Sequence, residues 1–383
     1  MQTPRVFRDV ISQPEAVTEL LRELNKETDV HHAWLFTGPP GSGRSEIALA
    51  FAAALVCDAG GCGICNACQM VSAGNHPDVQ VLNTERVQIS IDEVAEFIGR
   101  SFQMPAIANY RIMIVEDADR MKERTSNLLL KSLEEPPRGT IWMLCAPSEA
   151  DLLPTIRSRV RRIMLKVPSV EEVANLLIEK YGIEEKLALQ SAANAQSHVG
   201  MARRLATNSA ARDRRRQALL SVLSIMDIPS ALSASAALLR LAESDGAQLT
   251  AELDEQEKSE LLARLGVSAD GKMTPATRSQ IKKLEEAQKR RATRSKRDGL
   301  DRVFVDLMGL YRDVLTIQLG SGQRLINPDL EVEIRALAQD ITQAQAIHAI
   351  EKIQEVRYRM DRNVRENYLL DSLAVTLRRK VRR

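Results

Sequence analysis

The chain has 383 residues, a net charge of +2, and hydrophobic and charged fractions of 44% and 27%. This length predicts two or three domains, each able to bury a core of its own. No apolar stretch approaches the roughly 20 residues that cross a bilayer, and the charged residues Arg5, Arg8 and Asp9 near the start exclude a secretory signal. We therefore expect a cytoplasmic protein.

Short runs of β-forming residues alternate with helix-like segments from residue 33 to about residue 165. This alternation predicts βαβ units and a parallel sheet covered by helices. The expected strands are residues 33–37, 79–82, 111–115, 140–145 and 162–165. The fold class we expect is α/β followed by all-α, with a domain boundary near residue 166.

Beyond that boundary the pattern is helical to the end of the chain. Ser169, with Glu171 and Glu172 in the next turn, is typical of a helix start. Apolar residues at helical spacing predict a packed helix near residues 300–315. They are Leu300, Val303, Phe304, Leu307, Tyr311, Val314 and Leu315.

Residues 245–298 are polar, charged and poor in aromatic residues. We expect a partly flexible insertion between helices here, with Gly266 and the pair Asp270 and Gly271 as helix breakers. Residues 282–297 within it are strongly basic. Charge runs are most often solvated helix faces, so we predict a solvated helix rather than a DNA contact.

Residues 38–45 (GPPGSGRS) follow the first expected strand and fit the phosphate-binding pattern G-x-x-x-x-G-K-[ST] except at the lysine. In such a loop, glycines let backbone N–H groups converge on phosphates, and the final hydroxyl ligates Mg²⁺. The candidate nucleotide-binding residues are Gly38, Gly41, Gly43, Arg44 and Ser45.

Arg44 stands where the pattern has lysine. A planar guanidinium keeps the charge but is bulkier than an ammonium, so the exchange is not conservative in a close-packed phosphate site. The sequence therefore predicts a nucleotide-binding fold with impaired hydrolysis. It leaves open whether ATP and Mg²⁺ still bind.

Four cysteines, Cys57, Cys62, Cys65 and Cys68, have the spacing C-x4-C-x2-C-x2-C. In a reducing compartment such a cluster predicts metal ligands rather than disulfides, and four thiolates suit a tetrahedral, structural Zn²⁺. An iron–sulfur cluster is the rival. A catalytic zinc is less favoured, because four thiolates leave no position for water. Cys145, alone in an expected strand, is interpreted as a buried core residue.

The order of these motifs resembles the bacterial clamp-loader family of AAA+ proteins. Besides the phosphate loop and the cysteine insert, the resemblance rests on residues 10–16 (VISQPEA), on residues 127–137 (NLLLKSLEEPP) and on Ser158, Arg159 and Val160, where the family carries Ser-Arg-Cys. It covers residues 5 to about 206.

The resemblance implies a three-part chain. Residues 1–166 would form the AAA+ P-loop domain with its zinc module at 57–68, residues 167–207 a helical lid, and residues 208–383 a helical collar for oligomerisation with the charged insertion 245–298. The family joins five subunits in a ring. The implied partners are the gamma/tau and delta clamp-loader subunits of the DNA polymerase III holoenzyme, the sliding clamp, and primed DNA bound by the assembled complex.

The chain departs from the active members of that family after the third expected strand. Active members place an aspartate first, near Mg²⁺, and a glutamate second, but here Glu116 precedes Asp117. Aspartate is one methylene shorter and should fall about 1 Å short of the attacking water, a displacement that can cost roughly 100-fold in rate. A further departure is Ala146-Pro147, where active relatives offer a polar side chain to the γ-phosphate, with Ser148 nearby but displaced.

Arg159 matches the family's arginine finger, which reaches across the subunit boundary to a neighbour's ATP. The alternative is a surface arginine like Arg157, Arg161 and Arg162, which we expect to be dispensable. Arg203 matches a lid arginine that touches nucleotide in active relatives, and in this chain its role is open between contact and remnant.

The function we expect is that of a clamp-loader stator, which donates Arg159 to the adjacent ATPase subunit and has little or no ATPase activity of its own. One alternative is an active gamma/tau-type ATPase, which Arg44 and the exchanged acids oppose. Another is a zinc-dependent nucleic-acid-binding module. The cysteine cluster lacks the interleaved aromatic and basic residues that such a module uses.

Overall fold

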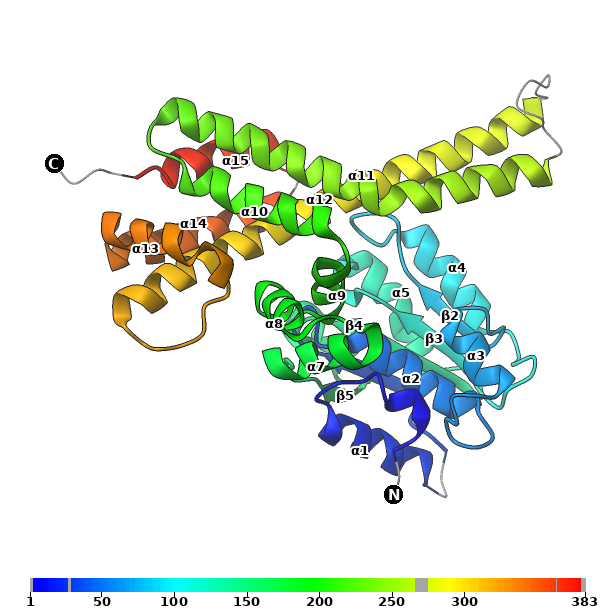
Figure 1. Cartoon of the computed structure of the whole chain (residues 1–383). Coiled ribbons are helices and arrows are strands. Elements are labelled where there is room, and N and C mark those ends of the chain that lie inside the picture. Colours follow the sequence, from blue (N-terminus) through cyan, green and yellow to red (C-terminus); the bar gives the residue numbers. More distant parts are fainter. Residues whose placement is uncertain (1–2, 27–28, 266–274, 363, 380–383) are drawn as a thin grey trace. The chain divides into compact units, whose positions relative to one another are not determined.

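The computed structural model describes residues 3–26, 29–265, 275–362 and 364–379, and it consists of two compact units (Figure 1). Residues 1–192 and 197–202 belong to the first unit, and residues 193–196 and 203–383 to the second. The first is α/β and the second all-α, as predicted. The finer division of the chain at residues 166 and 207 stays a prediction. Within the described part of the chain, no helix is both long and apolar enough to cross a membrane.

Five parallel strands form the sheet of the first unit, in the order β2-β3-β4-β1-β5. They are β1 (Ala33–Thr37), β2 (Val79–Leu82), β3 (Arg111–Val115), β4 (Thr140–Ala146) and β5 (Arg161–Met164). All residues of β1, β3 and β4 are buried, as expected of central strands covered on both faces. The predicted strands are confirmed to within one residue.

Helices cover both faces of this sheet. Three of them, α1 (Pro14–Leu24), α2 (Arg44–Val56) and α3 (Asn66–Ser72), pack with Trp34 and Phe36 of β1 into one apolar cluster. The alternate residues Ala33 and Leu35 join the opposite cluster, because successive side chains of a strand point to opposite faces. The helices on that face are α4 (Ile91–Ser101), α5 (Glu123–Glu134) and α6 (Pro154–Arg157).

Several shorter elements complete the first unit. They are the 3-10 helices η1 (Arg5–Phe7), η2 (Ala118–Arg120) and η3 (Glu149–Asp151), followed by α7 (Val170–Tyr181), α8 (Glu185–Asn194) and the start of α9 (Val199–Thr207). The predicted helix start is confirmed at α7, where Ser169 and Glu172 form a reciprocal capping box.

The described residues of the second unit form helices and no strands. The helices are α10 (Ser209–Leu223), α11 (Ile228–Arg264), α12 (Pro275–Leu319), α13 (Glu331–Asp340), α14 (Gln343–Asp361) and α15 (Glu366–Thr376), with the short η4 (Pro328–Leu330). The apolar residues predicted to pack near residues 300–315 all lie in α12. Leu300, Phe304, Leu307, Tyr311 and Val314 are buried in the core, and Val303 and Leu315 pack against it.

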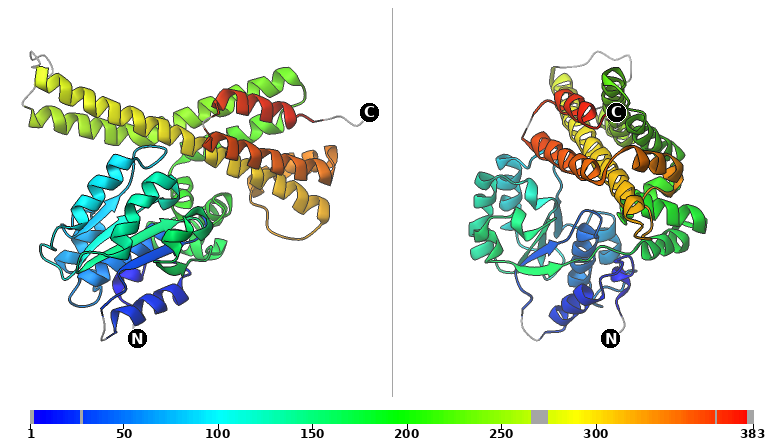
Figure 2. Two further views of the ribbon diagram at one scale, coloured as in Figure 1. Left: turned by 180° about the vertical axis from the view of Figure 1, so that it is seen from behind. Right: turned by 90° about the vertical axis from the view of Figure 1, so that its left-hand side faces the viewer.

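The described parts of the expected insertion, residues 245–264 and 275–298, are helical and continue α11 and α12. Its flexibility stays a prediction. Figure 2 shows the two helices side by side. A Cβ on Gly246 would lie 2.9 Å from the backbone nitrogen of Lys296, so glycine permits the close approach of α11 to α12. Further along, Arg291 pairs with Asp254 at 2.6 Å and with Glu257 at 2.7 Å.

The charged composition of this segment thus encodes pairing between helices as well as solvation. Lys289 and Arg290 are exposed on α12, as a solvated face requires. The predicted breakers Gly266, Asp270 and Gly271 lie outside the described residues.

Candidate functional site

The phosphate loop lies between β1 and α2, at the edge where the parallel strands end. Gly41 and Gly43 have φ angles of +87° and +85°, in the left-handed region that favours glycine. Gly43 caps the N-terminus of α2. Strand, loop and helix therefore follow one another as the pattern predicted, with the loop's backbone leading into a helix N-terminus, where anions bind.

Arg44 is turned back on its own loop. Its Nη1 donates a hydrogen bond to the carbonyl oxygen of Gly38, at a distance of 2.5 Å. His198, which precedes α9, packs closely over the loop, because a Cβ on Gly41 would lie 2.5 Å from the His198 Cα. An incoming phosphate would have to displace the hydrogen bond between Arg44 and Gly38. Ser45, at the start of α2, is the residue expected to ligate the Mg²⁺ of a bound nucleotide. No sequence pattern predicted the place of His198, because it is far from the loop along the chain.

The acidic residues after β3 lie at the same edge of the sheet. Glu116 follows the strand directly, and Asp117 has a left-handed φ of +49° and pairs with Arg120 at 3.3 Å. Burial and the charge of Asp117 raise the pKa of Asp119. The carboxylate of Asp117 is therefore engaged with its own 3-10 helix, in addition to being shorter than glutamate.

The end of β4 forms the third part of this region. Cys145 is buried, as predicted, and burial raises the pKa of its thiol, which keeps it protonated. Its Sγ lies 3.7 Å from the Arg44 carbonyl oxygen. Ser148 follows Ala146 and Pro147, and its hydroxyl accepts a hydrogen bond from the Ala150 N–H at 3.2 Å. That hydroxyl thus serves as the cap of η3.

Arg203 belongs to the second unit, and its role as a nucleotide contact stays a prediction. Its neighbour Arg204 has a different task. It forms a bidentate pair with Asp245, at 2.7 and 2.6 Å, and joins α9 to α11.

The four cysteines converge at the other end of α2. Their Sγ atoms all lie within 4.8 Å of one another. The Sγ of Cys57 is 3.7 Å from those of both Cys62 and Cys65. A tetrahedral ion with Zn–S bonds of about 2.3 Å separates its sulfur ligands by about 3.8 Å, so the spacing of Cys57, Cys62 and Cys65 is that of a zinc site.

Backbone N–H groups favour the thiolate forms of Cys57 and Cys62, which are the forms that ligate metal ions. Burial raises the pKa of Cys57, but N–H groups of Cys62, Gly61 and Ala59 outweigh it and lower that pKa to about 6. Backbone N–H groups also lower the pKa of Cys62, whereas burial raises that of Cys68. The set can bind a metal ion such as zinc. Because α2 has 13 residues, about 20 Å of helix separates this centre from the phosphate loop.

Arg159 lies in the short link between α6 and β5. Its Nη1 donates to the Thr155 carbonyl oxygen at 2.6 Å and to the Ser158 hydroxyl at 3.0 Å, and its Nη2 pairs with Glu134. The side chain is 33% exposed. Val160, in place of the family's cysteine, packs against the core on the α5 face.

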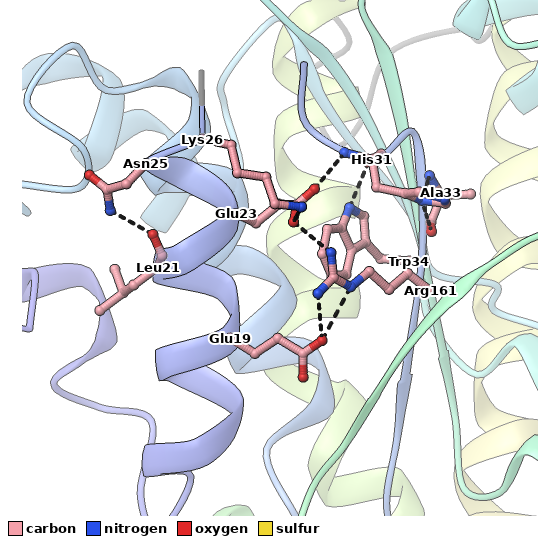
Figure 3. Close-up of polar contacts among 9 residues, drawn as sticks. All are labelled: Glu19, Leu21, Glu23, Asn25, Lys26, His31, Ala33, Trp34 and Arg161. Atoms are coloured by element: carbon pink, nitrogen blue, oxygen red, sulfur yellow. Dashed lines mark hydrogen bonds and ion pairs between the residues drawn. The ribbon is translucent and has the colours of Figure 1, made fainter. Parts of the chain in front are cut away.

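Arg161 is not a dispensable surface arginine, which corrects the prediction made from sequence. Figure 3 shows its guanidinium between Glu19, Glu23 and Trp34. It donates to Glu23 at 2.6 Å and to Glu19 at 2.9 Å, and it lies 5.1 Å from the ring centroid of Trp34. This cluster joins α1 to the first residue of β5, and it was missed because its members are far apart along the chain.

Glu23 is the centre of that cluster and is only 2% exposed. Its carboxylate also accepts hydrogen bonds from Lys26 and from the His31 N–H. Burial raises the pKa of Glu23, but these contacts and the charge of Arg161 outweigh burial and lower it. The buried charge is thus stable only while its partners are present.

We expect Arg161→Ala to lower the free energy of unfolding by about 2 kcal/mol near neutral pH, because it leaves a buried carboxylate with one partner fewer. Chemical denaturation of the purified chain measures this. The loss should shrink at acid pH, because a protonated Glu23 no longer needs a cation. Since the pKa of Glu23 is lowered, this change lies below the ordinary range of a glutamate carboxyl group. Arg162→Ala, which removes only an exposed pair with Glu149, is the control and should change stability little. Equal effects of the two substitutions would contradict this role for Arg161.

Comparisons with known proteins agree with the motifs. A family model described as "DNA polymerase III, delta subunit" matches residues 12–169, which include the phosphate loop, the cysteine cluster and Arg159. DNA polymerase III subunit delta' of Pseudomonas aeruginosa is 38% identical over 170 residues, 41% of this chain and 52% of that protein. The Bacillus subtilis subunit of the same name is 24% identical over 369 residues, 95% of this chain and 96% of that protein.

A relative with a different subunit name is also similar to this chain. DNA polymerase III subunit tau of Escherichia coli is 28% identical over 200 residues, 50% of this chain and 31% of that protein. The chain thus spans about half the length of the Pseudomonas relative and about a third of the Escherichia one.

Proposed function

We propose, from its similarity to proteins named delta' subunits of DNA polymerase III, that the chain is a stator subunit of the replicative clamp loader, a member of the clamp-loader family of AAA+ proteins. It donates Arg159 to the ATP site of an adjacent gamma/tau-type motor subunit. Together with the delta subunit, the assembly opens the sliding clamp and places it on primed DNA. We place this activity in the cytoplasm.

The single observation that carries this proposal is the contrast between Arg159 and the chain's own nucleotide site. Arg159 is solvent-accessible in a loop, with its guanidinium held at one edge by the protein. An arginine so placed can complete a phosphate site on another molecule, and arginines of this kind stabilise charge in the transition state of phosphoryl transfer.

The chain's own site supports the same division of labour. Arg44 is bonded to the loop it should leave open, and Asp117 is paired with Arg120. The Ser148 hydroxyl serves as a helix cap. Three independent defects in one site favour a subunit that holds its position while its neighbours hydrolyse ATP.

In this proposal the metal centre is a structural zinc held by four thiolates. The donor set is complete, which leaves no open position for a water or a substrate. Its role is to stabilise the segment between α2 and α3.

The second candidate function is that of an active gamma/tau-type ATPase. The similarity to the tau subunit of Escherichia coli and the intact glycines of the phosphate loop favour it. The two proposals differ in where ATP is hydrolysed.

We expect the purified chain to hydrolyse ATP negligibly, both as it stands and with Arg44→Lys. Restoring the lysine leaves the Asp117 defect in the same transition state. Steady-state ATP turnover by the chain alone, by its motor partner alone, and by their mixture measures this. Turnover by the chain alone at roughly 1 s⁻¹ or more, an ordinary enzyme rate, would establish the motor function instead.

A further inference from the structure

Glu134 and Arg159 come from separate elements of the first unit and meet in space. Glu134 is the last residue of α5, and Arg159 follows α6. Their ion pair joins the Oε1 of Glu134 to the Nη2 of Arg159. Glu134 belongs to the segment NLLLKSLEEPP that marked the family resemblance, and the proposed function gives this glutamate no task.

The hydrogen bonds of Arg159 use one side of the guanidinium. The group has five N–H donors in a planar fork. Nη1 donates to the Thr155 carbonyl oxygen and to the Ser158 hydroxyl, and Nη2 forms the ion pair with Glu134. Among the residues that the structure describes, the Nε–H and the second N–H of Nη2 have no partner. Two donors on a solvent-accessible group therefore remain for phosphate oxygens.

Both partners of the pair are solvent-accessible, at 33% for the Arg159 side chain and 46% for Glu134. An accessible ion pair contributes little to the stability of a fold. It does restrict a long side chain that would otherwise sample many rotamers, and a side chain fixed before binding loses less entropy when it binds. The carboxylate is thus suited to orient the arginine rather than to hold the domain together.

We infer that Glu134 is a positioning residue, whose carboxylate holds the Arg159 guanidinium with two N–H donors directed toward the nucleotide phosphates of the neighbouring subunit. This inference rests on the proposed function of Arg159 as a finger. The pair orients the arginine before the neighbour arrives, so that assembly does not have to order it.

The test uses the assembled clamp loader and compares Glu134→Ala, Glu134→Gln and Glu135→Gln. Glu135 is the matched control, because it is an exposed glutamate next in the chain and its side chain has no ion pair or hydrogen bond with the residues that the structure describes. We expect Glu134→Ala to lower kcat for ATP about three- to tenfold, the range that ordering one long side chain covers. KM, complex assembly and the melting temperature should stay unchanged. Glu134→Gln should lie between wild type and alanine, since its amide oxygen still accepts a hydrogen bond, and Glu135→Gln should match the wild type.

A double variant separates this inference from the function on which it rests. Glu134→Ala combined with Arg159→Ala should have the same kcat as Arg159→Ala alone, because the glutamate acts only through the arginine. If Arg159→Ala lowers kcat but Glu134→Ala leaves it unchanged or raises it, the positioning role is wrong and the finger stands. A further loss in the double variant also overturns the positioning role. If Arg159→Ala itself has no effect, the finger and the positioning role both fail.

Discussion

Replacing Arg159 with alanine is expected to lower ATP hydrolysis by the assembled clamp loader, while the chain itself stays folded and still enters the complex. The side chain lies in a solvent-accessible loop and contributes no core volume, so its loss costs little stability. The loss appears in another polypeptide's chemistry. At the ATP site bordering this subunit, a finger is worth about 10³ to 10⁵ in rate. Single-turnover ATP hydrolysis and clamp loading on primed DNA should fall together.

The controls for this experiment follow from the structure. Arg159→Lys should rescue poorly, because one ammonium does not reproduce the two-pronged contact of a guanidinium. Arg157→Ala and Arg162→Ala remove neighbouring exposed arginines and should be nearly silent. Arg161→Ala is unsuitable as a control, since it disturbs the buried Glu23. If the alanine variants at 157, 159 and 162 behave alike, the arginines form a diffuse basic surface and the finger assignment fails.

Local sequence patterns predicted the parts of this protein that depend on neighbouring residues. The five strands are continuous apolar runs that end at turns or helix caps, and the sheet follows from their alternation with helices. The phosphate loop could be predicted because its glycines sit at the two positions where the backbone needs a positive φ. The cysteine cluster could be predicted because its spacing brings four thiols together within two short turns.

The parts that depend on distant residues could not be predicted from such patterns. Arg161 looked like one of several surface arginines, and only the fold brings it to Glu23 and Trp34. His198 meets Gly41 in the same way. The pairing of the helices formed by residues 245–264 and 275–298 was not predicted, because composition does not reveal that acids of α11 face basic residues of α12. Pairing between two helices turns a polar sequence into an ordered one.

Removing one ligand of the metal centre is expected to have the largest effect on stability. We expect one tightly held zinc per chain, and Cys65→Ser should release it and lower the melting temperature markedly. Binding energy at a structural zinc site is folding energy, and apparent values of about 10–16 kcal/mol in zinc-finger peptides show its scale. Elemental analysis and thermal unfolding, with and without a chelator, measure both effects. Because ligation requires four thiolates, zinc affinity should also weaken as the pH falls, and most steeply below about 6, where Cys57 binds a proton as well.

Cys145→Ala is the matched control for the loss of a thiol, because Cys145 is buried in β4 and outside the cluster. It should cost some packing energy but leave the zinc content at one per chain. The effect of Cys65→Ser should be confined to stability. The cysteine cluster lies between α2 and α3, whereas Arg159 lies between α6 and β5, so at a temperature where the variant stays folded, the loader containing it should hydrolyse ATP at the wild-type rate. Iron in the purified protein, or zinc well below one per chain, would contradict the assignment of the metal. Loss of ATP turnover without loss of folding would show that the centre does more than stabilise the chain.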